Sequence, residues 1–300
     1  MNGKLDDFTH LDPAGRVTGK VAQRPRLAIY GLLGTGVALS WLVIGAMAVR
    51  GAASRSPGAD APGDPLLQAI PFFTLPEPIE RFFALCLTSA PLGEFGLSGF
   101  LALSAMWFVM AVAMMLPSAA PMLRTYCEIA DTAGTKGDVV VHPLVLVAGY
   151  LSVWLAAAFA FAGLTAGLYA LARAQPLDPA AGIAGAAALA IAGLYQFSGL
   201  KEACLEKCRN PFAILFANWS VNPVRIFRLG VDQGLWCLGC CWALMLVMFV
   251  VGTMNIFWMA LMALFTIVEK RTISPLATRV AGALLLVWAL ALLLISGLRA

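Results

Sequence analysis

Three cysteines lie within five residues of one another in the segment Cys237-Leu238-Gly239-Cys240-Cys241. Positions i, i+3 and i+4 of a helix share one face, so the three sulfur atoms would point in the same direction. Met245 and Met248 continue this stripe along the same helix. Converging thiols bind Cu(I), zinc or an Fe–S cluster. The other interpretation is that these cysteines are small buried hydrophobic residues.

A second pair of thiols, Cys204 and Cys208, has the i, i+4 spacing that aligns two side chains on a helix. The pair lies in the charged stretch 201–208, which we expect to be helical. Together with Cys237, Cys240 and Cys241, these residues are five of the seven cysteines. We expect all five at the cytoplasmic face of a membrane, where thiols stay reduced, and we expect the two clusters to approach one another.

Three methionines form a further stripe, because Met106, Met110 and Met114 follow one another at intervals of four residues. A thioether is a neutral, soft ligand for Cu(I). Methionine is also a flexible filler of apolar cores, so packing is the alternative role. Pro117 has no N–H to donate to the carbonyl of Ala113, so the helix should carry a free acceptor and a kink there.

The composition decides the class of protein. Of the 300 residues 61% are hydrophobic and only 12% are charged, about half the charged fraction of a soluble domain. Apolar runs long enough to cross a bilayer recur along the chain. These features predict an all-α, polytopic transmembrane helical bundle and exclude a soluble enzyme, a coiled coil and a disulfide-rich secreted domain. A net charge of +4, carried mostly by loops, indicates membrane topology and no nucleic-acid partner.

The chain divides into a tail, spans and loops. Residues 1–26 are predicted to be a cytoplasmic tail, and residues 27–300 a single transmembrane domain. Its long outer loop is placed at 50–96 and its cytoplasmic loop at 201–234. The expected spans are 27–49, 96–116, 143–172, 180–200 and 280–298, together with the uncharged stretch 235–268.

The 34 uncharged residues 235–268 decide the number of spans. A single helix of that length would be about 51 Å long, too long for one upright crossing. Fifteen of the twenty Lys and Arg residues fall on the cytoplasmic side if the segment is a hairpin that turns near residues 252–255. We therefore predict about seven spans with the N-terminus cytoplasmic. Six spans, with one long tilted helix, is the alternative.

The motifs of several enzyme classes are missing from this sequence. It has no H-E-x-x-H zinc motif and no glycine-rich phosphate loop. The predicted spans hold almost no Asp, Glu, Lys or Arg, which argues against a proton relay or a voltage sensor. We therefore expect a protein that is not an enzyme.

Four segments together resemble one known family. They are 110–117 (MAVAMMLP), 195–208 (YQFSGLKEACLEKC), 237–248, and the run from Met254-Asn255 through Trp258-Met259-Ala260 to Glu269-Lys270. In this order they resemble a bacterial family of predicted metal-binding integral membrane proteins of uncharacterised function. The similarity spans about residues 95–275. It implies a metal-linked role in the membrane, with copper as the metal.

The residues and the resemblance lead to three functional hypotheses. The first is Cu(I) uptake or delivery across the bacterial inner membrane, from the methionine stripe to the cytoplasmic-side cysteine cluster. Its partners would be the lipid bilayer and a metallochaperone or subunits of a membrane complex. The second is a structural or assembly subunit that holds no metal. The third is a thiol-redox membrane enzyme that uses Cys237, Cys240 and Cys241.

Overall fold

The computed structural model describes residues 25–54, 64–69, 76–87, 96–136, 139–174, 178–252 and 255–298. The predicted tail, apart from its last two residues, lies outside this range. Every regular element in the described residues is a helix. In chain order they are α2 (Pro25–Ser54), α3 (Asp64–Gln68), α4 (Glu77–Leu87), α5 (Gly96–Ser118), α6 (Ala120–Thr135), α7 (Pro143–Ala174), α8 (Asp178–Tyr195), α9 (Gly199–Arg209), α10 (Pro211–Ala217), α11 (Pro223–Val251), α12 (Ile256–Arg271) and α13 (Leu276–Leu298).

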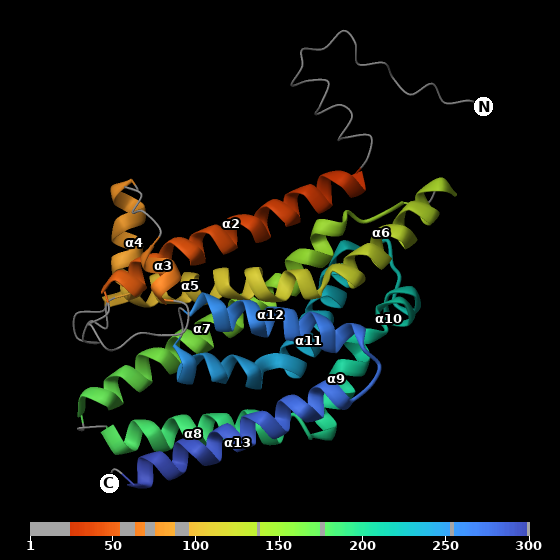
Figure 1. Ribbon diagram of the computed structural model, residues 1–300. Coiled ribbons are helices and arrows are strands. Elements are labelled where there is room, and N and C mark those ends of the chain that lie inside the picture. The colour runs from red at the N-terminus through yellow and green to blue at the C-terminus, as the bar shows by residue number, and fades with distance from the viewer. Residues whose placement is uncertain are drawn as a thin grey trace.

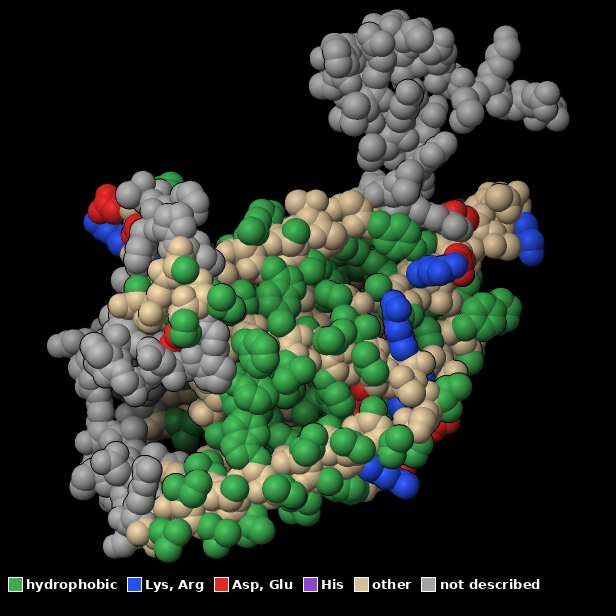
Figure 2. Space-filling view, viewed as in Figure 1, with side chains coloured by type: hydrophobic (Ala, Val, Ile, Leu, Met, Phe, Trp, Pro, Cys, Tyr) green, Lys and Arg blue, Asp and Glu red, His purple; other side chains and the backbone are tan. Residues whose placement is uncertain are grey.

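The long helices lie side by side in one bundle (Figure 1). Among the described helices, α2, α5, α7, α11 and α13 are long and apolar enough to cross a membrane, and the bent pair α8–α9 adds a sixth if it forms one span. Hydrophobic side chains cover the middle of the visible face, whereas most of its charged side chains gather at the two ends (Figure 2). This confirms the predicted all-α membrane bundle. The count of seven spans and the side of the N-terminus stay predictions.

The stretch 235–268 is not one helix. α11 ends at Val251 and is capped by Gly252, whose φ of 98° lies in the region that favours glycine. α12 begins after Asn255, whose side-chain oxygen accepts hydrogen bonds from the backbone N–H groups of Phe257 and Trp258. α12 then returns along α11, so that Lys270 reaches Cys237. The chain therefore turns back between α11 and α12, and the single long helix is wrong.

The predicted cytoplasmic loop 201–234 is largely helical. It contains α9, α10 and the first turns of α11. A bend of 61° separates α8 from α9. Ser198 caps the new helix by accepting a hydrogen bond from the backbone N–H of Lys201. The bend turns α9 toward the bundle and buries one of its faces, which carries Lys201, Cys204 and Leu205.

α5 shows the free acceptor predicted at Pro117, while the kink stays a prediction. The helix continues through this proline to Ser118, and α6 follows almost at once. The Ala113 carbonyl, which Pro117 cannot serve, accepts a hydrogen bond of 3.1 Å from the indole Nε1 of Trp41 in α2. The free acceptor therefore ties the first helix to α5.

α7 and α11 cross at two glycines. A Cβ atom on Gly149 would collide with the backbone carbonyl of Phe227, and one on Gly230 with that of Leu146. Because backbone atoms cannot move aside as a flexible side chain can, only glycine permits this approach. The crossing holds the cysteine-bearing part of α11 against α7.

Two pairs of closely spaced glycines, one in α8 and one in α7, have different surroundings. Gly182 and Gly185 of α8 lie against Ser296 and Leu292 of α13. Gly163 and Gly167 of α7 have open space where a Cβ atom would sit. Only the first pair therefore serves close helix packing within this chain.

Candidate metal-binding site

Thiols from two helices meet around Cys240. Its thiol group lies close to the thiols of Cys208, Cys237 and Cys241 and interacts with them electrostatically. Cys204 also lies against α11, because a Cβ atom built on Gly239 would be 2.6 Å from its Sγ atom. The bend before α9 thus brings the two predicted cysteine clusters together. We call Cys204, Cys208, Cys237, Cys240 and Cys241 the thiol cluster.

The thiol cluster is largely buried, and two of its thiols donate hydrogen bonds to the backbone. Four of its cysteines are buried, all except the half-buried Cys208, and all five are free thiols. The thiols of Cys240 and Cys241 donate to the backbone carbonyl of Cys237, at 3.1 Å and 2.8 Å. Across the described part of the chain, no three Cys, His, Asp or Glu side chains are arranged to share one ion. The arrangement therefore offers pairs of sulfur atoms and not the four-ligand cage of a structural zinc site.

Two further helices reach the thiol cluster. The Cys241 thiol lies 3.6 Å from the thioether sulfur of Met115 in α5. The Tyr150 hydroxyl of α7 lies 3.1 Å from the Cys237 sulfur and donates to the Met115 carbonyl at 3.1 Å. Met115 and Tyr150 thus fix the position of α5 and α7 relative to the sulfurs of α11.

Lys270 brings a positive charge to the thiols. Its ammonium group donates to the Cys237 sulfur at 3.0 Å and to the Ser118 hydroxyl at 2.7 Å. The ion pairs found among the described residues do not include Lys270. Its charge is therefore available to balance a thiolate at the cluster.

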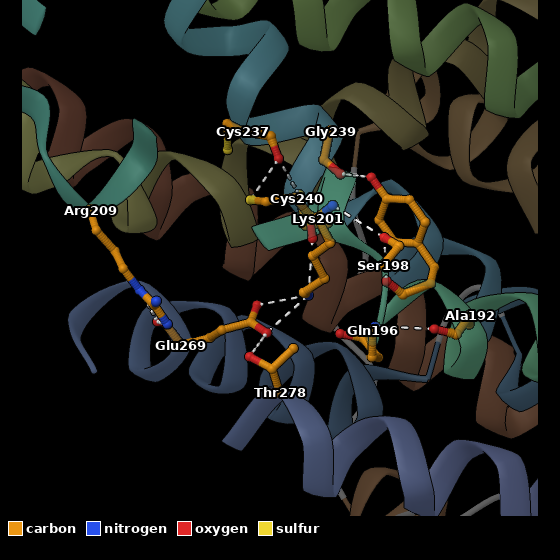
Figure 3. A network of polar contacts seen from close by, with 12 residues as sticks. Ala192, Gln196, Ser198, Lys201, Arg209, Cys237, Gly239, Cys240, Glu269 and Thr278 are labelled. Atoms are coloured by element: carbon orange, nitrogen blue, oxygen red, sulfur yellow. Dashed lines mark hydrogen bonds and ion pairs between the residues drawn. The ribbon is translucent and has the colours of Figure 1, made fainter. Parts of the chain in front are cut away.

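Beside the cluster lies a buried ion pair (Figure 3). Lys201 and Glu269 are each 1% exposed, and the Lys201 ammonium lies 2.9 Å and 3.0 Å from the two carboxylate oxygens. The same ammonium donates to the Cys240 carbonyl at 3.1 Å. Thr278 donates to the carboxylate at 2.7 Å, and Arg209 donates to the Glu269 backbone carbonyl. The pair therefore ties α9, α11, α12 and α13 together at the level of Cys240.

The methionine stripe lies in the interior, as expected. Met106, Met110 and Met114 are buried, and they belong to the same core as the thiol cluster, as do Met245 and Met248. The sulfur that contacts the thiols, however, belongs to Met115. Each residue turns a helix by about 100°, so Met115 lies beside the stripe and reasoning from four-residue intervals missed it.

Sequence reasoning also missed the interior charges, which are the buried Lys201 and Glu269 and the partly buried Lys270. Lys201, Glu269 and Lys270 were placed at or beyond the ends of the spans, and the spans were expected to hold almost no ionisable groups. One signal was available for Lys201. It precedes Cys204 by three residues and Cys208 by seven, which places all three on one face of a helix. No comparable signal marked Glu269 and Lys270, because their contacts in the interior depend on the return of α12 along α11.

A family model described as "PpoB2: Copper chaperone" matches residues 104–292, more than half of the chain. The match extends from α5 to α13 and includes the thiol cluster, Met115, Tyr150, Lys270 and the buried ion pair. No curated protein and no solved structure matches.

Proposed function

Since the chain belongs to the PpoB2 family of copper chaperones, we propose that it binds Cu(I) at the thiol cluster and delivers the ion to another protein. The observation that carries the proposal is the gathering of soft sulfur atoms at one place, where α9 lays Cys204 against α11, Cys208 lies close to Cys240, and Met115 lies 3.6 Å from Cys241. Thiolates and thioethers select Cu(I) because both ligand and ion are soft. Cu(I) is stable with two or three such ligands, which pairs of cysteines can supply.

The charges around the cluster favour a monovalent ion. Two thiolates and one Cu(I) ion together carry a charge of −1. The Lys270 ammonium, 3.0 Å from the Cys237 sulfur, brings this sum to zero. Lys201 and Glu269 neutralise each other and add nothing to it. Since an uncompensated charge is costly in a dry interior, neutrality supports Cu(I) over a divalent ion with the same two thiolates.

A path for the ion follows from the order of the sulfurs. Met106, Met110 and Met114 are neutral ligands that would bind and release Cu(I) quickly, and thiolates would hold it more tightly. Met115 joins α5 to the cluster through Cys241. We propose uptake or delivery along this gradient in a bacterial inner membrane, with a metallochaperone or a membrane-complex subunit as the partner. Binding and release are sufficient for this role, so we propose that the protein is not an enzyme.

The test is a Cu(I) titration of the detergent-purified protein against a competing chelator, under reducing conditions, followed by elemental analysis. We expect bound copper in the unmodified protein. We expect at least about a 100-fold weaker affinity in the double variant Cys208→Ser/Cys240→Ser, since both sulfurs are proposed ligands. Cys127→Ser is the matched control, because Cys127 is buried in α6 outside the cluster. Equal affinities in the double variant and the control would refute the site. Absence of copper from all three proteins would favour a structural subunit.

A further inference from the structure

A cavity of about 250 Å³ lies on the side of Lys201 that faces α13. Its walls come from the turn between α8 and α9, from α9 itself, and from the start of α13. The polar residues that line it are Gln196, Ser198, Lys201, Glu202, Arg209, Thr278 and Arg279. The thiol cluster does not line this cavity, so it is a second space with a chemistry of its own.

The first indication of a ligand is Gln196. This side chain is only 4% exposed. Its Nε2 atom donates to the Ala192 carbonyl at 3.2 Å, whereas its Oε1 atom is buried without a hydrogen-bond partner. In Figure 3 the side-chain oxygen points away from Ala192, toward the side where Lys201 and Thr278 lie. Because buried polar atoms normally have partners, the cavity calls for a ligand with an N–H or O–H donor.

The second indication is the charge of the walls. The lining residues include three cations, Lys201, Arg209 and Arg279, and one anion, Glu202. Glu269 neutralises Lys201 from behind the wall. Arg209 uses Nε and Nη2 for the Glu269 carbonyl and keeps Nη1 for another acceptor. An excess of one positive charge remains, which favours a ligand with an anionic group such as a phosphate.

The third indication is the surface around the cavity. Phe197, which lines it, is 51% exposed, and Leu276 at the start of α13 is 66% exposed. Leu200 in the first turn of α9 is also exposed. In a helix bundle with membrane-spanning lengths, exposed apolar side chains of this kind face acyl chains. A phosphate-bearing ligand at such a place would have its apolar part alongside α8 and α13.

We propose that this cavity binds the headgroup of an anionic phospholipid that carries a hydroxyl donor, the chemistry of phosphatidylglycerol. The phosphodiester pairs with Arg209 and Arg279, and a headgroup hydroxyl donates to Gln196 Oε1. Phosphatidylethanolamine offers a donor, but its ammonium adds a cation to a positive site. Phosphatidylcholine offers neither a donor nor a net charge. The site therefore ranks phosphatidylglycerol first, phosphatidylethanolamine second and phosphatidylcholine last.

Native mass spectrometry of the detergent-purified full chain tests this ranking with one defined lipid at a time. We expect phosphatidylglycerol to bind at least about tenfold more tightly than phosphatidylcholine. Arg279→Gln should reduce this preference several-fold, whereas Arg228→Gln should leave it unchanged, because Arg228 is an exposed cation on the first turns of α11. Gln196→Leu should weaken phosphatidylglycerol and leave phosphatidylcholine unchanged. An unchanged elution volume in size-exclusion chromatography and an unchanged thermal unfolding temperature would show that the variants are folded.

Two results would overturn the proposal. The first is equal affinity for the three lipids, or a phosphatidylglycerol preference that Arg279→Gln and Gln196→Leu leave intact. The second is binding of free glycerol 3-phosphate as tight as that of the lipid, which would make the ligand a soluble phosphate ester. Neither result depends on copper, so the proposal and the copper function can fail separately.

Discussion

The two faces of α11 are both buried, but they differ in kind. One face joins a large core with α5, α7 and α12, and it carries the three cysteines of α11 together with Met245 and Met248. The other face packs against α8 and α13. Its small core consists of Leu189, Ala192, Ala243, Leu244, Val247, Leu285 and Ala289, all hydrophobic.

This difference shows which face of α11 meets polar side chains in the interior of the bundle. Sulfur side chains pack almost as hydrocarbons do, so the first face needs no special compensation for them. The polar side chains that contact the cysteines of this face are paired: Tyr150 with Cys237, Lys270 with Ser118, and Lys201, which reaches the Cys240 carbonyl, with Glu269. The face toward α8 and α13 has no such groups among its buried core residues. Substitutions on the two faces should therefore have separable effects on metal binding and on stability.

The largest effect is expected from Lys201→Met. The substitution leaves the Glu269 carboxylate buried without its cation, so the free energy of unfolding should fall by about 3–5 kcal/mol. Lys207→Met is the matched control, because Lys207 is an exposed lysine of the same helix. Equilibrium unfolding in mixed detergent micelles measures both.

The double variant Lys201→Met/Glu269→Leu sharpens this prediction. It removes both charges, so most of the lost stability should return. If Lys201→Met is as stable as the Lys207→Met control, the ion pair does not stabilise the packing of α9 against α11, α12 and α13.

A substitution that creates a cavity on the face of α11 toward α8 and α13 should lower stability without changing metal binding. Leu244 is buried among hydrophobic residues of α8 and α13. Leu244→Ala should lower the free energy of unfolding by about 2–5 kcal/mol. Its Cu(I) affinity, measured by chelator competition below the unfolding temperature, should equal that of the unmodified protein. A loss of Cu(I) affinity in Leu244→Ala would contradict the prediction that the two faces of α11 affect stability and metal binding separately.

Lys270→Met tests the charge balance at the thiol cluster. Without the ammonium, a dithiolate site holding Cu(I) keeps a net negative charge in the interior. We expect the Cu(I) affinity to fall about 10- to 100-fold, the usual effect of losing a residue that supports a ligand. The preference for Cu(I) over Zn(II) should fall with it. Arg271→Met, at the exposed neighbouring position, is the control. An unchanged metal preference would remove Lys270 from the proposal.

The smallest effect on stability is expected in the methionine stripe. Met110→Leu and Met114→Leu nearly conserve side-chain volume. Each substitution should therefore lower the free energy of unfolding by less than about 1.5 kcal/mol. If the stripe conducts Cu(I), copper accumulation in cells should drop far more than stability does, at matched protein levels. Met115→Leu, which removes the sulfur beside Cys241, should weaken binding in the purified protein as well. Normal accumulation in the stripe variant would make Met110 and Met114 core packing.

Several features of this protein were determined by the sequence itself. Helical spans follow from the length of apolar runs, and the turn at residues 252–255 follows from the balance of Lys and Arg. The one-face spacing of Cys237, Cys240 and Cys241 is also local, because helical periodicity depends on neighbouring residues alone. The free carbonyl of Ala113 follows from the missing N–H of Pro117, four residues later.

Only the tertiary structure decided which of these faces meet. The bend before α9 brings Cys204 and Cys208 to α11, and the return of α12 brings Lys270 to Cys237. Lys201 and Glu269 are 68 positions apart in the sequence, yet they neutralise each other in the interior. Their burial is stable only because the partner is present, and a partner from another helix leaves no trace in the local pattern of either segment.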